Sequence, residues 1–211
     1  MGESSGRILA ALTSLASVVE RVETSRPNRI IGIAGLPGAG KSTVAAQLVE
    51  VLPNAVLLPM DGFHLPKARL VELGRRDRMG APDTFDVDGF VATLSAIRAG
   101  ESFDAPSFDR VIEEAVPGAI QVSPENVVVV EGNYLLLDTG GWESVAPLLD
   151  LTFFVDVEED IRVQRLIERH VAFGKTRDAA TAWALGPDAV NARLIEATAQ
   201  RADHRITLPP A

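Results

Sequence analysis

The feature that most constrains the fold is a glycine-rich segment between an apolar run and a helical pattern. Residues 35–42 read GLPGAGKS and fit the pattern G-x-x-x-x-G-K-[ST]. The apolar run 29–34 precedes this segment, and a helical stripe of Val44, Leu48 and Val51 follows it. In such a strand–loop–helix unit, successive backbone N–H groups can surround phosphate oxygens, and the helix directs its positive end at them. The segment therefore predicts a phosphate-binding loop.

The polar residues of this loop predict how a nucleotide is held. The Lys41 ammonium group would reach the β- and γ-phosphates, and the Ser42 hydroxyl would ligate Mg²⁺. A chance glycine-rich turn is the alternative, but the flanking strand and helix favour the functional reading. ATP and Mg²⁺ are therefore the expected ligands. The residues expected to hold them are Gly35, Gly38, Ala39, Gly40, Lys41, Ser42 and Thr43.

Apolar runs and helical stripes alternate along the chain. Further strands are predicted at residues 55–60, 127–130, 151–157 and 204–208, the second of which could continue through 134–137. Helical stripes lie at 8–19, 90–97, 161–167 and 183–199. The run 29–34 and the next three strand segments are mostly apolar, as in strands that are buried on both faces. The alternation of strands with helices indicates a parallel sheet. A chain of 211 residues is expected to form one such α/β domain.

Two acidic residues directly follow predicted strands. Asp61 follows the run 55–60, and Glu131 follows the four valines of 127–130. Ligands of open parallel sheets bind beyond the carboxyl ends of the strands, so both acids should face the same crevice as the phosphate loop. We assign Glu131 to Mg²⁺, directly or through water, and Asp61 to the base that orients or deprotonates an acceptor hydroxyl. The alternatives are a turn formed by Asp61 with Gly62 and a solvated strand end for Glu131.

Position alone singles out further side chains. His64 lies close to Asp61 and could contact a substrate or be structural, whereas His170 is read as structural. Arg165 and Arg169 are four residues apart and so share one helix face. Such a helix could bring an arginine to the transferring phosphoryl group, which is worth about 10³–10⁵ in rate in related chemistry. The alternative is an exposed, salt-bridged helix face.

Composition and charge exclude several classes of protein. The net charge of −9 disfavours nucleic-acid binding, and the absence of cysteine excludes disulfides and thiolate metal sites. Basic residues gather at 67–78 and 162–177, which suits a small anionic ligand better than a polymer. Residues 1–7 lack the pattern of a signal peptide and no stretch is long and apolar enough to span a bilayer, so a cytoplasmic protein is expected.

Four segments after the phosphate loop carry a family resemblance. They are MDGFH at 60–64, GAPDTFD at 80–86, PSFDR at 106–110 and VVEGNY at 129–134. In these segments and their order, the chain from about residue 30 to its end resembles the uridine kinase, phosphoribulokinase and bacterial pantothenate kinase branch of P-loop kinases. It looks most similar to the group known as fructose-transport-system kinases, which also shares the run NARL at 191–194.

This resemblance implies a P-loop fold with three α/β/α layers and a five-stranded parallel sheet in the order 2-3-1-4-5. Within a single kinase domain of residues 1–211, the residue pattern predicts an N-terminal helix at 1–27 and acceptor-site excursions within 61–125, and the resemblance implies a helical lid at 158–195. It also implies that Asp61 activates the acceptor hydroxyl, that Glu131 serves Mg²⁺, and that the lid carries arginines. The residues expected to take part are Lys41, Asp61 and Arg169 in catalysis, Arg165 in nucleotide binding, and His64, Phe85, Asp86, Asp109, Arg110 and Tyr134 in the acceptor pocket.

The acceptor is narrowed by departures from two members of this branch. Uridine kinases carry an acid where this chain has Gly80, and pantothenate kinases carry a histidine where it has Asp109 and Arg110. By the resemblance to fructose-transport-system kinases, a sugar or another small polyol, as in a fructokinase-like enzyme, is the leading acceptor. A nucleoside or a pantothenate-like precursor is the alternative. A homo-oligomer is compatible with the sequence.

A nucleotide switch without an acceptor is the alternative from a different class. The segment DVDG at 86–89 fits the D-x-x-G of a switch loop, but no [NT]-K-x-D run for guanine and no LSGGQ segment occur. A switch also has no evident use for the Asp61 carboxylate, and a pure binding module leaves Lys41, Ser42 and Glu131 unexplained. The sequence therefore favours a kinase.

Overall fold

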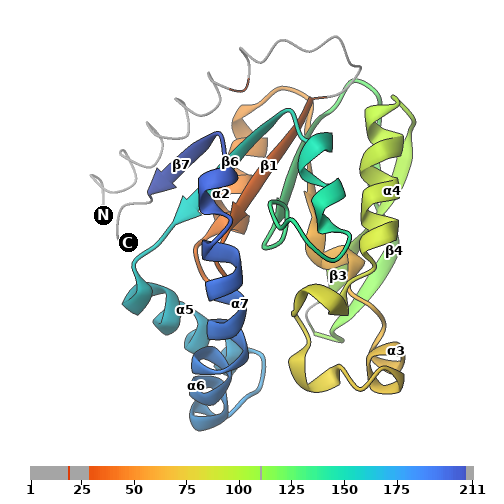
Figure 1. Cartoon of the computed structure of the whole chain (residues 1–211). Helices are drawn as coiled ribbons and strands as arrows, with labels where there is room; N and C mark the ends of the chain where they lie inside the picture. Colours follow the sequence, from red (N-terminus) through yellow and green to blue (C-terminus); the bar gives the residue numbers. More distant parts are fainter. Residues whose placement is uncertain (1–18, 20–28, 110, 208–211) are drawn as a thin grey trace.

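A five-stranded parallel sheet forms the centre of the structure, a computed structural model that describes residues 19, 29–109 and 111–207 (Figure 1). Its strands are β1 (Arg29–Gly35), β2 (Ala55–Pro59), β5 (Val127–Gly132), β6 (Leu151–Asp156) and β7 (His204–Thr207). They lie side by side in the order β2-β5-β1-β6-β7. Counted along the chain over these five strands alone, this is the expected order 2-3-1-4-5.

The core of the domain surrounds β1, which pairs with β5 on one side and with β6 on the other. In this register Ile31 lies opposite both Val129 and Leu151. Side chains that point to either face of these strands are buried, among them Ile30, Ile31, Ile33, Val128, Val129, Val130, Phe153 and Phe154. Continuous apolar runs therefore predicted the central strands correctly, because both faces of the sheet are covered.

The helices of the described residues are α2 (Lys41–Val51), α4 (Val87–Arg98), α5 (Glu159–Ala172), α6 (Arg177–Leu185) and α7 (Pro187–Glu196), together with the short α3 (Lys67–Glu72). Short 3₁₀ turns lie at η1 (Met60–Phe63), η2 (Arg76–Arg78), η3 (Pro82–Thr84), η4 (Trp142–Ser144), η5 (Ala146–Leu148) and η6 (Ala199–Arg201). Helix α2 packs against β1, β2 and β5, and α4 packs against η4 and η5. This is the predicted α/β class with layers on the sheet. No helix among the described residues is long and apolar enough to cross a membrane.

An antiparallel hairpin is the main feature that the sequence did not predict. Strands β3 (Phe103–Asp109) and β4 (Glu114–Val122) pair with each other and form a second, two-stranded sheet. This stretch holds prolines at 106 and 117, which lack a backbone N–H for strand pairing, and it was expected to form only an excursion. The pairing shifts register between Ala105 and Ser107, so Pro106 lies at an irregularity of the ladder, where a missing N–H is tolerated.

The predicted bounds of one helix and one strand were wrong. The single helix predicted at 183–199 is divided into α6 and α7 at Gly186, because Pro187 occupies the first turn of a new helix. Residues 134–137 form a turn closed by the Leu137 N–H and the Tyr134 carbonyl rather than extending β5. The predicted helix at 1–27 lies outside the described residues except for Val19, which is buried.

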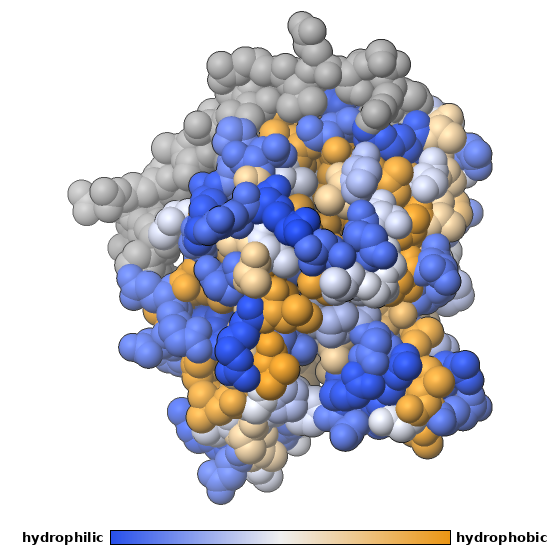
Figure 2. Space-filling model, in the orientation of Figure 1, coloured by the Kyte–Doolittle hydropathy of each residue, from blue (hydrophilic) through white to orange (hydrophobic). Residues whose placement is uncertain are grey.

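Two groups of elements extend beyond the carboxyl ends of the strands (Figure 1). We call α5, α6 and α7 the lid side, and residues 60–86 with the adjacent ends of β3 and β4 the hairpin side. In the space-filling view a notch separates the two groups below the sheet (Figure 2). The phosphate loop opens into the cleft between them, as the position of ligands in open parallel sheets requires.

Candidate active site

The phosphate loop runs from the end of β1 to the start of α2. Gly40 caps α2 with φ of 97°, and Gly38 has φ of 84°, both in the left-handed region that glycine adopts without strain. A Cβ atom on Gly38 would lie 2.9 Å from the carbonyl oxygen of Arg162 in α5. The lid side therefore packs directly on the loop backbone, and a larger residue at this position would displace it.

The residues predicted to hold phosphate and metal lie together at the end of this loop. Lys41 is only 7% exposed, and its Nζ donates a hydrogen bond of 3.0 Å to the Leu36 carbonyl oxygen. Glu131 is 6% exposed and lies opposite Ile33 of β1 and Pro59 of β2 in the sheet register, at the centre of the carboxyl edge. The Ser42 hydroxyl donates to Glu131 Oε1 over 3.3 Å. The predicted hydroxyl and carboxylate are thus adjacent.

The Ser42–Glu131 pair fits a magnesium ion as nucleotide-binding proteins hold it. Mg²⁺ prefers oxygen ligands and keeps several waters, so one or two protein oxygens and the phosphates of the substrate suffice. Within the described part of the chain, no three His, Asp or Glu residues form a group that could hold a metal alone. A site shared with nucleotide phosphates is therefore the arrangement that these residues offer.

Asp61 lies in η1, directly after β2, and lines the same cleft as Lys41, Ser42 and Glu131. The backbone N–H of His64 donates to the Asp61 carbonyl oxygen over 3.2 Å, and the His64 ring nitrogen Nδ1 lies 2.8 Å from the same oxygen. These contacts close the tight turn that follows the strand. The structure thus brings the candidate base, the metal pair and the phosphate loop to one rim, as the strand-end argument expected.

Three aromatic rings form one wall of the cleft on the hairpin side. The His64 ring packs between Phe85 and Phe108, with ring centroids 4.0 Å and 4.7 Å away. His64 and Phe85 also form an isolated antiparallel bridge, which ties the turn after β2 to the loop before α4. All three residues line the cleft beside Asp61. His64 and Phe85 are therefore placed where the sequence predicted an acceptor.

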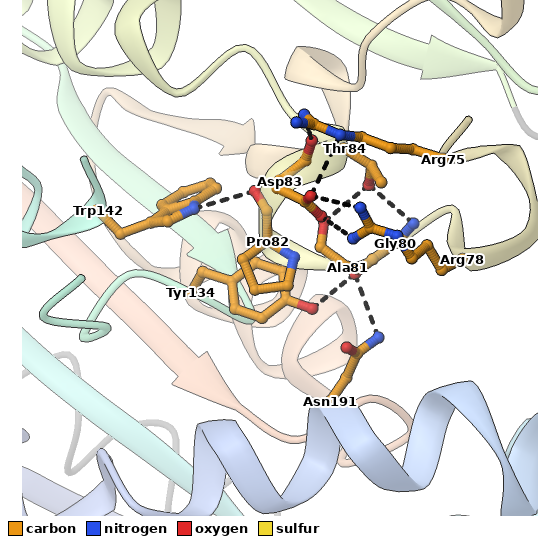
Figure 3. Close-up of polar contacts among 10 residues, drawn as sticks. All are labelled: Arg75, Arg78, Gly80, Ala81, Pro82, Asp83, Thr84, Tyr134, Trp142 and Asn191. Carbon is orange, nitrogen blue, oxygen red and sulfur yellow. Dashed lines mark hydrogen bonds and ion pairs between the residues drawn. The ribbon is translucent and has the colours of Figure 1, made fainter. Parts of the chain in front are cut away.

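Side chains from other parts of the chain hold loop residues 80–84 in place through hydrogen bonds to the loop backbone (Figure 3). The Tyr134 hydroxyl donates to the Gly80 carbonyl oxygen over 2.6 Å, and Asn191 Nδ2 reaches the same oxygen over 3.4 Å. The Trp142 ring N–H donates to the Pro82 carbonyl oxygen over 3.2 Å. Burial raises the pKa of Tyr134 far above its ordinary value, and the nearby charges of acidic residues raise it further. The phenol therefore stays a hydrogen-bond donor that supports the cleft wall.

The basic residues of the cluster at 67–78, which the sequence analysis considered suited to a small anion, form ion pairs with acidic residues of the same chain. Arg75 and Arg78 both pair with Asp83, and the hydrogen bond from Arg78 is the main reason that the pKa of Asp83 lies below its usual range. Lys67 and Arg76 pair with Glu113 over 3.2 Å and 2.9 Å. The charges of this cluster therefore hold the hairpin side together, and its suitability for a small anion stays a prediction.

Three residues predicted to contact the acceptor have structural contacts instead and do not line the cleft. Asp86 is the N-cap of α4 and accepts a 3.0 Å hydrogen bond from Gly89 N. Asp109 accepts two backbone N–H groups at the turn between β3 and β4. Tyr134 is fully buried behind Gly80. Arg110 lies outside the described residues.

The arginines of α5 do not all lie where the sequence analysis expected them. Arg169 lines the cleft, whereas Arg165 does not. Arg162, which the sequence did not single out, is 1% exposed and packs against Gly38. Its Nε and Nη2 bind the Glu159 carboxylate over 2.7 Å and 2.6 Å, but its buried Nη1 has no hydrogen-bond partner among the described residues. A buried donor beside the phosphate loop is suited to a nucleotide oxygen.

The lid side contributes four cleft residues that the sequence did not predict, namely His170, Trp183, Asp188 and Asn191. His170 Nε2 lies 2.8 Å from Asp188 Oδ2, which joins the end of α5 to the start of α7. The run NARL contained Asn191, but no spacing pattern marked the other three. Pro37, Met79, Gly80, Glu113, Gly132 and Asn133 complete the lining.

A phosphate loop on a parallel sheet of this order, with one acid directly after β2 and another near the carboxyl end of β5, defines a P-loop kinase. Residues 30–209 match the Phosphoribulokinase / Uridine kinase family, and the chain belongs to this family. The chain is 33% identical over 197 residues to the uncharacterized protein YggC of Escherichia coli strain K12, covering 90% of this chain and 82% of that protein. It is also 33% identical over 175 residues to the pantothenate kinase of Shewanella piezotolerans, covering 76% of this chain and 55% of that enzyme.

Among solved structures, one from Silicibacter sp. TM1040, named provisionally as a fructose transport system kinase, superposes with a TM-score of 0.83. It is 39% identical, and the match covers 92% of this chain and 98% of that one. The family and fold expected from the sequence are thereby confirmed. The chain is a phosphotransferase with an alcohol group as acceptor, and kinases of this family use ATP.

Proposed function

We propose that the protein is an ATP- and Mg²⁺-dependent kinase that phosphorylates a hydroxyl of a small sugar or polyol, in the manner of a fructokinase. The observation that carries the proposal is the single cleft in which Lys41, the Ser42–Glu131 pair and Asp61 meet an aromatic wall. The first three groups suit the phosphates of ATP, and the wall provides a place for a second molecule. Since ATP is available in the cytoplasm, we place the reaction there.

The nucleotide end of the cleft would bind and orient the phosphates. Backbone N–H groups of the loop and the N-terminus of α2 favour negative charge, and Lys41 adds a buried cation beside them. Arg169 and Arg162 approach the loop from the lid side. Mg²⁺ bound near Ser42 and Glu131 would neutralise charge on the phosphate oxygens. Together these groups would stabilise a transferring phosphoryl group.

The acceptor end would supply the base. The Asp61 carboxylate accepts the proton of the substrate hydroxyl while the hydroxyl oxygen forms a bond to the γ-phosphorus of ATP. The bond between that phosphorus and the oxygen bridging to the β-phosphate breaks, and ADP leaves with the bonding electrons. Asp61 then releases its proton to solvent. The rings of His64, Phe85 and Phe108 would pack against the carbon skeleton of the acceptor.

The similarity to the Silicibacter protein supports a sugar as acceptor. The similarity to the Shewanella pantothenate kinase supports a pantothenate-like alcohol instead, and the family also includes uridine kinases. In this chain Gly80 stands where the uridine kinase pattern has an acid. We therefore place the sugar first and the pantothenate-like alcohol second.

Release of ADP from Mg-ATP tests the proposal directly. The rate is measured without an acceptor and with D-fructose, other sugars and polyols, uridine and pantothenate in turn. We expect a sugar or polyol to raise the rate well above the acceptor-free rate and to yield a phosphate ester detectable by ³¹P NMR. Stimulation by uridine or pantothenate alone would replace the acceptor in the proposal. Hydrolysis that no acceptor changes would favour a nucleotide switch.

A further inference from the structure

We propose that the acceptor is an uncharged polyhydroxy compound and that Asp188, held by His170, accepts a hydrogen bond from one of its hydroxyl groups. The inference rests on the proposed kinase function, to which it adds a substrate class and a specificity-determining residue on the lid side. It comes from the geometry of Asp188 and from the distribution of charge around the acceptor end of the cleft.

Asp188 is a buried carboxylate that nevertheless lines the cleft. It is 8% exposed and lies in the first turn of α7, where the helix dipole favours a negative charge. His170, in the last turn of α5, lies with Nε2 2.8 Å from Asp188 Oδ2. Among the described residues this is the carboxylate's one hydrogen-bond partner, so Oδ1 is left for a ligand. A carboxylate held in this way accepts hydrogen bonds but donates none, as a substrate hydroxyl requires.

The position of this carboxylate is fixed relative to the hairpin side. Asn191 lies one turn further along the same face of α7 and also lines the cleft. Its side chain reaches the Gly80 carbonyl oxygen over 3.4 Å, at the point that the Tyr134 hydroxyl also binds (Figure 3). Asp61 and Asp188 both line this cleft, Asp61 from the turn after β2 and Asp188 from the lid side. An acceptor beside Asp61 would therefore also meet Asp188.

The charges at the acceptor end disfavour an anionic substrate. Asp61, Glu113 and Asp188 are the carboxylates that line this end, apart from the metal-linked acid. The basic residues Lys67 and Arg76 are paired with Glu113 and so compensate an acid of the same wall. Lys175 of the lid side acts on the same carboxylate more weakly and lies over the Trp183 ring. The cations Lys41 and Arg169 line the cleft too, but they serve the transferring phosphate in the proposed function. A carboxylate on the acceptor would be repelled by Asp61 and Asp188.

Matched pairs of alcohols and acids test the substrate class. Pantothenol and pantothenate, glucose and gluconate, and glycerol and glycerate each share hydroxyl groups and differ in the carboxylate. For the pairs that the enzyme phosphorylates, we expect kcat/KM for the uncharged member to exceed that for the acid by about tenfold or more.

Asp188→Asn tests the residue, because asparagine keeps the shape and an oxygen for His170 but loses the charge. We expect KM for the uncharged acceptor to rise about 10- to 100-fold, with little change in kcat or in KM for Mg-ATP. The preference for the uncharged member of each pair should shrink. Asp178→Asn is the matched control, since Asp178 lies in the first turn of the neighbouring helix α6, is exposed and does not line the cleft.

The possible outcomes of these experiments distinguish failure of this inference from failure of the proposed kinase function. A wild-type enzyme that transfers phosphate but prefers the acids would overturn it. So would an Asp188→Asn variant whose acceptor KM matches that of Asp178→Asn, even if its melting temperature falls, because the His170 pair would then be only structural. A wild-type enzyme that no acceptor stimulates would instead reject the proposed kinase function, and this inference with it.

Discussion

The two ends of the cleft are built in different ways. The nucleotide end consists largely of one contiguous segment, residues 35–42, completed by Glu131 at the end of a neighbouring strand. The acceptor end is assembled from the turn after β2, the loop before α4, the β3–β4 hairpin and the lid helices. The donor chemistry therefore depends on local backbone geometry, whereas the choice of acceptor depends on how four distant segments pack together.

This difference predicts how substitutions will divide between kcat and KM. Changes at the nucleotide end should impair phosphoryl transfer with every acceptor, because they act on the group that all acceptors receive. Changes in the supports of the acceptor end should alter stability and acceptor KM while Mg-ATP binding persists. The following variants test this division.

Lys41→Met should have the largest effect. The buried ammonium group is removed from beside the phosphate loop, so we expect kcat to fall by about 10³-fold or more with any acceptor. The melting temperature, measured in parallel, should show that the variant is folded. If kcat changed for one acceptor and not for another, the nucleotide end would not act independently of the acceptor.

Asp61→Asn should rank next. Loss of the base at the junction of the two ends should reduce kcat by about 10²–10⁴-fold, while the Kd for Mg-ATP measured by calorimetry stays close to that of the wild type. Loss of nucleotide binding in this variant would contradict the role of a base. A kcat loss greater than that of Lys41→Met would reverse the order of the two contributions.

The same contrast explains what could be predicted from the sequence. The phosphate loop, Asp61 and Glu131 follow apolar runs directly, and a parallel sheet brings the ends of its strands together, so their meeting in one cleft could be inferred. Asp188 follows no strand. It reaches the cleft because Pro187 starts a new helix, and α7 runs from α6 back towards the sheet (Figure 1).

At the acceptor end, the type of a residue did not predict its role, because the role depends on where the side chain points. Asp86 and Asp109 lie in segments that resemble acceptor sites, yet their carboxylates bind backbone N–H groups of the adjacent helix and turn. Asp, Asn and Ser commonly do this at helix starts and turns. The segment DVDG, considered as a switch loop, is the cap of α4, and only the three-dimensional structure decided between the two readings.

Tyr134→Phe should weaken the acceptor end without affecting the nucleotide end. The variant removes a 2.6 Å hydrogen bond and leaves the Gly80 carbonyl oxygen, within the described part of the chain, with the 3.4 Å contact from Asn191 alone. We expect a loss of about 1–3 kcal/mol in the free energy of unfolding by urea. The acceptor KM should rise several-fold and the KM for Mg-ATP should not. An unchanged stability would mean that this bond does not support the wall.

Alkaline titration isolates the same side chain, because Tyr134 is the one tyrosine in the sequence. Burial raises its pKa in the folded state, so its contribution to stability is complete below the ordinary pKa of about 10 and is lost as the pH rises towards the folded pKa. Tyrosinate absorbance should therefore appear only when the protein unfolds. A tyrosinate signal near pH 10 from folded protein would contradict the buried position.

Asp86→Ala should have the smallest effect and gives the sharpest test of the boundary of the acceptor end. Loss of the cap of α4 should cost about 1 kcal/mol in the free energy of unfolding, since the Gly89 N–H loses its 3.0 Å partner. Asp86→Ser should recover most of that loss, because serine also caps helices. Neither variant should change kcat or acceptor KM appreciably. A raised acceptor KM in both variants would show that the carboxylate contacts substrate and that the acceptor end extends further along α4.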